Sequence, residues 1–205
     1  MTSLAASIVV LTILHLIQAQ ENEIVKAMLL NEVIPDVLDE GPKEVLKVTF
    51  DNGAKVNMGN ELTPTQVQNQ PHVEWESEEG AYYTLLMTES DAPSRADKSV
   101  GEWQHWLVGN IAGNNVAKGT LLSGYQGSGP MLGTGLHRYV YLLFKQPHQL
   151  EFDEKFSPNT TTEGRPLFST RKFMKKYNLE TPIAGNFYEA QYDEIAGVLL
   201  AQLGF

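Results

Sequence analysis

The amino-acid sequence predicts a mainly β fold with two helices near its carboxyl end. Short runs rich in Val, Leu, Tyr and Phe are separated by clusters of Gly, Pro, Asn and Asp, as in strands joined by turns. Two later segments instead combine a capping residue with features typical of helices. The core is therefore expected to consist mainly of sheet.

Four strands are expected. Leu46 to Phe50 alternates between nonpolar and polar residues, as in a strand with one face in water. Tyr82 to Met87 is almost continuously nonpolar, as in a strand covered on both faces. The expected strands are Val45 to Phe50, Tyr82 to Thr88, His105 to Ile111 and Arg138 to Lys145.

Two helices follow, and both are expected to pack against the sheet. Ser169 can cap a helix that runs through Tyr177 and presents a basic face to solvent. Asp193 and Glu194 suit the positive amino end of a second helix. The nonpolar positions of this helix lie at helical spacing: Ile195, Leu199, Leu200 and Leu203.

Length and composition limit the possible classes of protein. The 205 residues show no repeat or convincing linker, so residues 20–205 are expected to form a single domain. The absence of cysteine excludes disulfide frameworks, thiolate metal sites and a cysteine nucleophile. Fifteen basic against 25 acidic residues give a net charge of −10, which disfavours nucleic-acid partners and broad docking on anionic membranes.

Residues 1–19 are expected to be a secretory signal peptide. Met1 to Gln20 contains no Asp, Glu, Lys or Arg, and Leu4 to Ile17 is mostly apolar but shorter than the ~20 residues of a membrane-spanning helix. Ala19 is a small residue that suits cleavage. The mature chain would then be secreted and extracellular, without a transmembrane segment; an uncleaved anchor or a wrongly chosen start is the alternative. Asn159-Thr160-Thr161 is an acceptor sequence for N-glycosylation.

Common enzyme signatures are absent from the sequence. The glycine cluster Gly127 to Gly135 has Leu132 where a dinucleotide fingerprint needs glycine, and it lacks the Gly-Lys-Ser/Thr ending of a phosphate loop. Ser128 has no glycine two residues to either side, so it is not a hydrolase elbow. No His-Glu-x-x-His motif occurs. We therefore expect no catalytic residues, no cofactor and no metal.

Two turn-rich segments next to strands, residues 87–106 and 127–139, are the candidate functional loops, because rigid sheet ends can hold polar groups around a cleft. The imidazole of His105 and the amide at Gly129 can donate hydrogen bonds to an anionic group in such a cleft. Glu89 and Asp91 could then face an ammonium group. His137 and Tyr139 could form polar or stacking walls.

Other polar and aromatic residues have structural interpretations. Arg95, with Asp97, and Arg138 are expected to fix loops through ion pairs or hydrogen bonds. Trp103 and Trp106 are expected to be core or pocket scaffold, whereas His72 and His148 are expected at the surface.

The motifs in these loops resemble those of the phosphatidylethanolamine-binding protein family. Asp91-Ala92-Pro93-Ser94-Arg95 is followed by Glu102-Trp103-Gln104-His105, and Gly127-Ser128-Gly129-Pro130 by Gly133-Thr134-Gly135-Leu136-His137-Arg138-Tyr139. The segment Leu62 to Val67 and the residues Arg171-Lys172-Phe173 with Tyr177 extend the resemblance over nearly all of the mature chain.

The resemblance implies antiparallel sheets with C-terminal helices packed on the sheet, and a small pocket for phosphate-containing head groups. It also implies cis peptide bonds at Ala92-Pro93 and Gly101-Glu102. The family's pattern is altered at four positions: Glu89 replaces an aspartate, Ser90 replaces a proline, Met131 replaces a usual proline, and Leu200 stands where some members have tyrosine. The pocket residues implied by the resemblance are Glu89, Asp91, Ala92, Pro93, His105, Gly129, Met131, His137, Tyr139 and Leu200.

Three hypotheses for function follow. The first is a secreted binding protein that holds a phosphatidylethanolamine-like head group or a small phosphorylated ligand. The second is protein recognition, because the resemblance also implies serine protease inhibitors and modulators of kinase signalling; an extracellular protease suits a secreted chain better than a cytosolic kinase. The third is a metal-dependent hydrolase in which His105, His137 and Asp91 would bind the metal.

Overall fold

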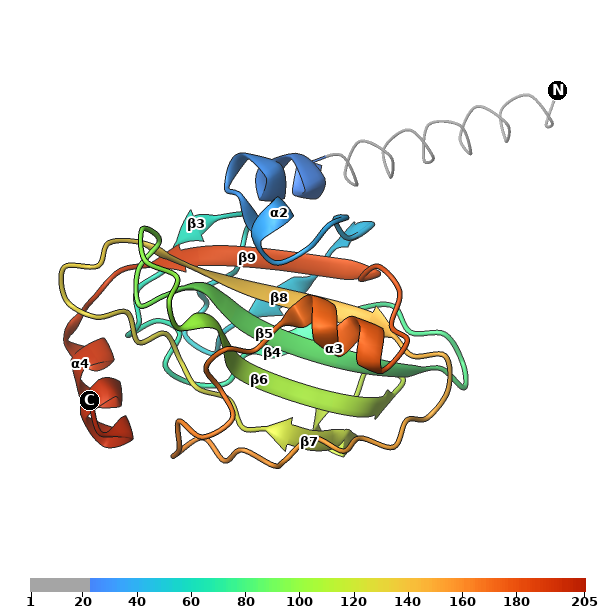
Figure 1. Cartoon of the computed structure of the whole chain (residues 1–205). Coiled ribbons are helices and arrows are strands. Elements are labelled where there is room, and N and C mark those ends of the chain that lie inside the picture. Colours follow the sequence, from blue (N-terminus) through green and yellow to red (C-terminus); the bar gives the residue numbers. More distant parts are fainter. Residues whose placement is uncertain (1–22) are drawn as a thin grey trace, which may run out of the picture.

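A central sheet of seven strands organises residues 23–205, which are the part of the chain that the computed structural model describes (Figure 1). The expected signal peptide lies outside these residues. The strands follow the order β1-β9-β8-β5-β6-β7, and β3 also pairs with β9. Their bounds are β1 Glu44–Val45, β3 Asn60–Glu61, β5 Tyr82–Ala92, β6 Gly101–Ala112, β7 Thr120–Ser123, β8 His137–Lys145 and β9 Ala184–Ala190.

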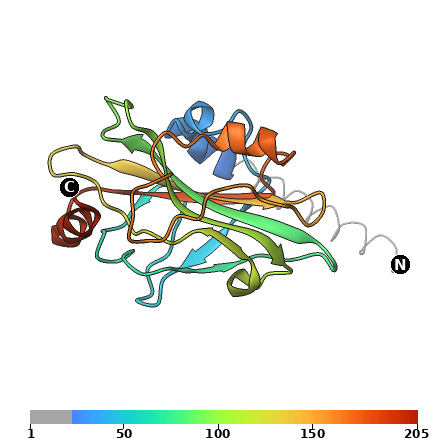
Figure 2. The ribbon, with the colours of Figure 1, turned by 60° about the horizontal axis from the view of Figure 1, so that its bottom comes forward.

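Both faces of this sheet are covered (Figure 2). Residues 23–30, which are helical, lie with α2 (Val33–Asp36) and α3 (Thr170–Lys176) on one face. A two-stranded antiparallel sheet of β2 (Lys47–Thr49) and β4 (His72–Glu74) covers the other. The molecule therefore has three layers, and the central strands are buried on both sides.

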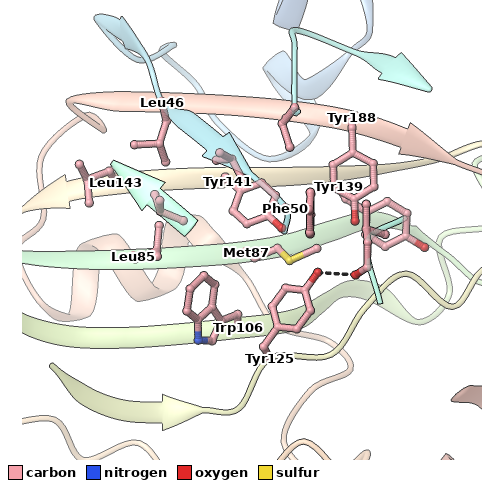
Figure 3. Packing of buried hydrophobic residues seen from close by; sticks show 14 of the residues in the cluster. Leu46, Phe50, Leu85, Met87, Trp106, Tyr125, Tyr139, Tyr141, Leu143 and Tyr188 are labelled. Carbon is pink, nitrogen blue, oxygen red and sulfur yellow. Dashed lines mark hydrogen bonds between the residues drawn. The ribbon is translucent and has the colours of Figure 1, made fainter. Parts of the chain in front are cut away.

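The period of two along a strand divides the core into two clusters. Tyr83, Leu85 and Met87 of β5 point toward the two-stranded sheet, whereas Leu86 between them points toward the helices. Figure 3 shows the first cluster, in which Tyr139 and Tyr141 of β8 lie beside Tyr188 of β9. Strand β5 is buried from Tyr83 onward, as the nonpolar run predicts.

The mainly β fold is confirmed, and all four expected strand regions contain strands. The region from residue 45 to residue 50 divides between β1 and β2, where Lys47 is exposed and Val48 is buried, as the alternation predicts. Strands β3, β4, β7 and β9 were not expected from the sequence. The first three are short, and β9 contains Gly185 and Asn186, which are poor strand formers. The sheet is antiparallel except where β1 and β3 pair with β9 in parallel.

Both expected helices are present. The side chain of Ser169 caps α3 by accepting a hydrogen bond from the Lys172 amide, and α3 packs on the sheet through Phe173. The side chain of Asp193 caps α4 (Glu194–Leu203) by accepting from the Ala196 amide at 3.0 Å. However, α4 lies beyond the end of the sheet, and Ala196 is its one buried residue (Figure 1). A short 3-10 helix, η1 (Val116–Lys118), precedes β7.

Among residues 23–205 the cis peptide bonds are Ile34-Pro35 and Ala92-Pro93. The expected bond at Ala92-Pro93 is confirmed, but the expectation for Gly101-Glu102 is wrong. Gly101 instead begins β6 with a φ of 69°, a left-handed conformation that glycine adopts without steric cost. In the same residues no helix has the length and apolar character needed to cross a membrane.

Candidate functional site

A pocket lies at the end of the sheet where β5 ends and β8 begins. It encloses about 580 Å³ of space that atoms do not fill, part of it open to solvent. Its polar lining consists of Glu89 from β5, His105 from β6, His137 from β8 and Gln126 from the segment after β7. The sheet thus brings together side chains that are far apart in the sequence.

Glu89 is the centre of the polar floor. It continues the series of Tyr83, Leu85 and Met87 along β5, so it points to the same side of the sheet as these core residues but lies at the pocket. Its two carboxylate oxygens face different imidazoles: Oε1 lies 2.5 Å from Nδ1 of His137, and Oε2 lies 3.3 Å from Nε2 of His105. Glu89 is only 6% exposed.

The partners of His105 fix where its protons lie. Its Nδ1 faces the backbone carbonyl oxygen of Gln126 at 2.9 Å, and its Nε2 faces the Glu89 carboxylate. Both partners can only accept, so the imidazole is the donor in each of these bonds. On His137 the second nitrogen, Nε2, lies 2.7 Å from the Thr134 hydroxyl.

The two imidazoles keep Glu89 ionised. Burial by itself raises the pKa of Glu89, but hydrogen bonds and positive charge from His105 and His137 outweigh it and lower the pKa from 4.5 to about 2. The floor of the pocket therefore combines a fixed negative charge with imidazole donors. Such a mixture suits a ligand that itself has both an anionic and a cationic group.

Aromatic residues behind the floor hold His105 in place. The edge of the His105 ring contacts Tyr139 at a centroid distance of 5.1 Å, and Tyr139 stacks on Tyr188 at the same distance. Trp103 donates from its indole nitrogen to the Gln126 side-chain oxygen at 3.3 Å. The backbone carbonyl of Gln126 is the partner of His105. Burial raises the pKa of Tyr139 well above 10, as does the charge of Glu89, so its hydroxyl stays neutral.

The walls of the pocket are mainly apolar, and α4 supplies one of them. Leu199 packs so closely on the loop before β8 that a Cβ at Gly129 would lie 3.2 Å from its Cδ2 atom. Phe205 approaches Trp103 at a centroid distance of 6.1 Å. The apolar lining residues are Ala92, Pro93, Val100, Trp103, Met131, Leu199, Leu200, Leu203 and Phe205.

Most of the residues predicted for the site lie together in this pocket. Tyr139 does not line it, because its ring is fully buried behind His105. Asp91 does not line it either. The predicted residues that line the pocket are Glu89, Ala92, Pro93, His105, Gly129, Met131, His137 and Leu200.

The placement of Asp91 corrects its expected role at an ammonium group. The pairing of β5 with β6 shifts register between Glu89 and Ala92, and the Asp91 carboxylate is bonded to Arg138 instead of facing the pocket. Arg138 also bonds to Asp36 and to the Asn31 carbonyl. Asp91 is thus a structural partner of Arg138, which fixes segments as expected.

The same placement separates the three residues expected as metal ligands. Asp91 bonds to Arg138, whereas Glu89 contacts both His105 and His137. Within the described part of the chain, no group of three or more His, Cys, Asp or Glu residues is arranged to hold a metal ion. Arg95 fixes the loop after β5 as expected, but its acidic partners are Glu32 and Glu189 rather than Asp97.

Sequence reasoning missed several lining residues. Gln126 directly precedes the glycine motif but was not singled out. Trp103, by contrast, was expected as core or pocket scaffold, and it lines the pocket. Leu199 and Leu203 belong to the nonpolar stripe of α4, which by its pattern predicts packing on a sheet. Because α4 lies beyond the end of the sheet, its nonpolar stripe instead forms a wall of the pocket. The remaining missed residues are Val100, Gly127 and Phe205.

Comparison with known proteins gives consistent matches. The family profile described as "Phosphatidylethanolamine-binding protein" matches residues 47–189. "Putative odorant-binding protein A5" of Drosophila melanogaster is 37% identical over 172 residues, which cover 84% of this chain and 82% of that protein. The "26 kDa secreted antigen" of Toxocara canis is 43% identical over 159 residues, which cover 78% of this chain but 61% of the antigen.

A solved structure supports the same relationship. The carboxypeptidase Y inhibitor, determined in complex with its cognate proteinase, superposes with a TM-score of 0.73 at 27% identity. The match covers 84% of this chain and 97% of the inhibitor. The names of these relatives describe binding and inhibitor proteins and one secreted antigen.

Proposed function

Because the chain belongs to the phosphatidylethanolamine-binding protein family, we propose that it is an extracellular, non-enzymatic protein that binds an amphipathic molecule with a phosphate-containing or zwitterionic head group. The expected signal peptide and the similarity to a protein named as a secreted antigen support the extracellular location. The relative named as an odorant-binding protein supports capture of a small ligand.

The observation that carries the proposal is the position of Glu89 between His105 and His137 at the bottom of a pocket. The bond from His105 is the weaker of the two, at 3.3 Å, so an anionic group can take over this donor. An ammonium group can approach the Glu89 carboxylate. One ligand with both charges would satisfy the whole floor.

The glycines of the loop add possible donors for the anion. Gly127 and Gly129 line the pocket, and among residues 23–205 neither of their N–H groups donates to a backbone carbonyl, although the Gly129 amide faces the Tyr139 hydroxyl. With no side chain in the way, their backbone can approach a phosphate closely. We therefore propose the backbone at Gly129 as a contact of the anionic group.

The apolar walls favour an amphipathic ligand over a free ion. A head group on the floor would leave the rest of the molecule against Leu200 and Leu203 of α4 and against Met131, which is 38% exposed. Burying an aliphatic chain there contributes roughly 25 cal/mol per Å² of apolar surface. The expected ligand therefore resembles a phospholipid or a smaller molecule with one polar end.

Calorimetry with phosphoethanolamine, inorganic phosphate and a short-chain phosphatidylethanolamine tests the proposal. We expect His105→Ala to weaken binding of all three, because it removes a donor from the floor, and His72→Ala to leave binding unchanged. His72 is an exposed partner of Asp51 and serves as the matched control. Equal affinity of the parent and His105→Ala would show that the ligand does not bind at this site. If the lipid binds no more tightly than phosphate, the proposal of an amphipathic ligand is wrong.

The similarity to the carboxypeptidase Y inhibitor supports a second candidate function, inhibition of an extracellular protease. Pull-down from extracellular fluid with the parent protein and with His105→Ala separates protease recognition through the surface from recognition through the pocket. A protease retained equally by both proteins would indicate recognition through the surface. Retention lost only with the pocket variant would indicate recognition through the pocket.

A further inference from the structure

A second hollow lies outside the pocket, and its lining is uncharged. It encloses about 710 Å³, again partly open to solvent. Its lining includes three residues with amide side chains, Gln68, Asn69 and Gln70, and two large apolar residues, Leu121 and Phe156. Amide groups beside an apolar surface suit a neutral sugar, whose hydroxyls need hydrogen-bond partners and whose C–H faces pack on aromatic rings. We call this hollow the amide groove.

The walls of the amide groove are held by the backbone. The Tyr125 hydroxyl donates to the Val67 carbonyl at 2.7 Å, which ties one side to the core and is the bond drawn at Tyr125 in Figure 3. On the other side, Ser157 donates to the Leu122 carbonyl at 3.0 Å and accepts from the Gly124 amide at 2.8 Å. The groove is therefore a preformed feature next to β7.

Asn159 lies at the edge of this groove, in the only Asn-x-Ser/Thr triplet of the sequence that lacks proline at x. Asn159 and Thr160 form a turn that closes with a hydrogen bond from the Thr161 amide to the Pro158 carbonyl at 3.3 Å. The carbonyls of Asn159 and Thr161 accept from the Gln126 side chain, both at 3.0 Å. The Asn159 side chain is exposed and makes no hydrogen bond to any described residue.

Two large apolar side chains beside Asn159 lack cover. Phe156, three residues before the acceptor, is 54% exposed, and Leu121 is 47% exposed. Both line the amide groove. Exposed apolar side chains that gather around a hollow indicate a surface that another group covers.

We propose that Asn159 bears an N-linked glycan whose first sugars lie in the amide groove, against Phe156 and beside the amides of residues 68–70. The donor would be a lipid-linked oligosaccharide diphosphate of the secretory compartment. The Asn159 amide nitrogen bonds to C1 of the first sugar and loses one proton, while the bond from C1 to the diphosphate oxygen breaks and the lipid diphosphate leaves with the electron pair. This proposal depends on export of the chain and not on the ligand of the pocket.

Expression of the full chain in a secreting eukaryotic cell line tests the attachment. We expect the intact mass of the secreted protein to exceed that of the polypeptide by a glycan, which peptide N-glycosidase removes. Asn159→Gln should be secreted with the polypeptide mass alone. An unmodified parent protein would overturn the proposal, whether it is secreted or retained.

Thermal unfolding of six proteins, with and without Asn159→Gln in each of three backgrounds, tests the position of the sugars. We expect the glycosylated parent to unfold at a Tm roughly 2–4 °C above that of Asn159→Gln, the shift that about 1 kcal/mol produces at this chain length. In the Phe156→Ala background this difference should disappear. In the Leu30→Ala background it should persist, because Leu30 is 73% exposed and does not line the groove. If the glycan shifts Tm equally with and without Phe156, the first sugars do not lie in the amide groove.

Discussion

Arg138 donates to both carboxylate oxygens of Asp91, from Nε at 2.8 Å and from a terminal nitrogen at 2.5 Å, with both side chains fully buried. The Arg138 amide bonds to the same carboxylate at 2.9 Å. This pair lies at the register shift near the end of β5, next to Ala92 and Pro93, which line the pocket. Asp91 thus holds Arg138 instead of lining the pocket.

The first prediction concerns this ion pair. Asp91→Ala should lower the free energy of unfolding by about 3–5 kcal/mol, because the buried guanidinium of Arg138 loses its main partner. Urea denaturation measures the change. Lys47→Ala is the matched control, since its pair with Glu74 is exposed and contributes about 0–1 kcal/mol. Similar losses in the two variants would contradict the structural role of Asp91.

The second prediction is a pH dependence that arises from Glu89. Its pKa is lowered on folding from 4.5 to about 2, so the folded state favours its ionised form. The resulting stabilisation is fully present above pH 4.5 and is lost as pH falls toward 2, where the unfolded chain binds the proton more tightly.

Urea unfolding of the parent and Glu89→Gln between pH 7 and pH 2 measures this effect. We expect the parent to lose its stability advantage over the variant below pH 4.5, because glutamine cannot ionise. Other acids with lowered pKa values, such as Asp36 and Asp193, are common to both proteins and cancel in the difference. A difference that stays constant over this range would refute the assigned shift.

The third prediction concerns Arg165, which is fully buried beneath the strand of His105. Burial lowers its pKa to about 10. Its side chain donates to the backbone carbonyls of Gln104, His105, Gly124, Ser157, Pro158 and Thr161.

Arg165→Lys should cost on the order of 3 kcal/mol of stability, because lysine cannot reach all of these carbonyls and a buried polar group without a partner costs roughly 1–3 kcal/mol. Denaturant unfolding provides the measurement. Arg171→Lys, at a half-exposed arginine on α3, should change stability by no more than about 1 kcal/mol. Equal effects of the two substitutions would argue against the buried carbonyl cluster.

The fourth prediction separates the two halves of the proposed ligand. Leu200→Asp should weaken binding of a short-chain phosphatidylethanolamine by about tenfold or more, because contact with a wall leucine contributes roughly 1.5–3 kcal/mol. Binding of free phosphoethanolamine should change much less. Val198→Asp is the control on the same helix, since Val198 does not line this pocket. An equal loss for both ligands in calorimetry would place Leu200 at the head group instead.

The fold was predictable because its signals are local. Alternation from Leu46 to Phe50 and the nonpolar run from Tyr82 to Met87 report directly which faces of a strand meet the core. The side chains of Ser169 and Asp193 mark helix starts by accepting hydrogen bonds from the first turn. Strand β9 was missed because Gly185 and Asn186 are poor strand formers. Contacts with residues distant in sequence hold them in the strand, such as the hydrogen bond from the Asn186 side chain to the Leu46 carbonyl.

The candidate site was predictable only in part. The spacing of residues in β5, β6 and β8 cannot show that Glu89 contacts both His105 and His137, because the contact depends on strand pairing. The register shift before Ala92 reverses the expected role of Asp91, and a one-residue change in register moves a side chain to the other face. No local pattern in the sequence marks such a shift.

The sequence alone determined the class of fold, the family motifs and most of the residues that line the pocket, since periodicity, turn chemistry and motif order are properties of short segments. Tertiary structure decided that Asp91 supports Arg138, that α4 forms a wall, and that Asn159 lies beside an uncharged groove. The physical reason is the same in each case. These outcomes depend on which distant backbone segments approach one another, and a side chain takes its role from the partners that this packing supplies.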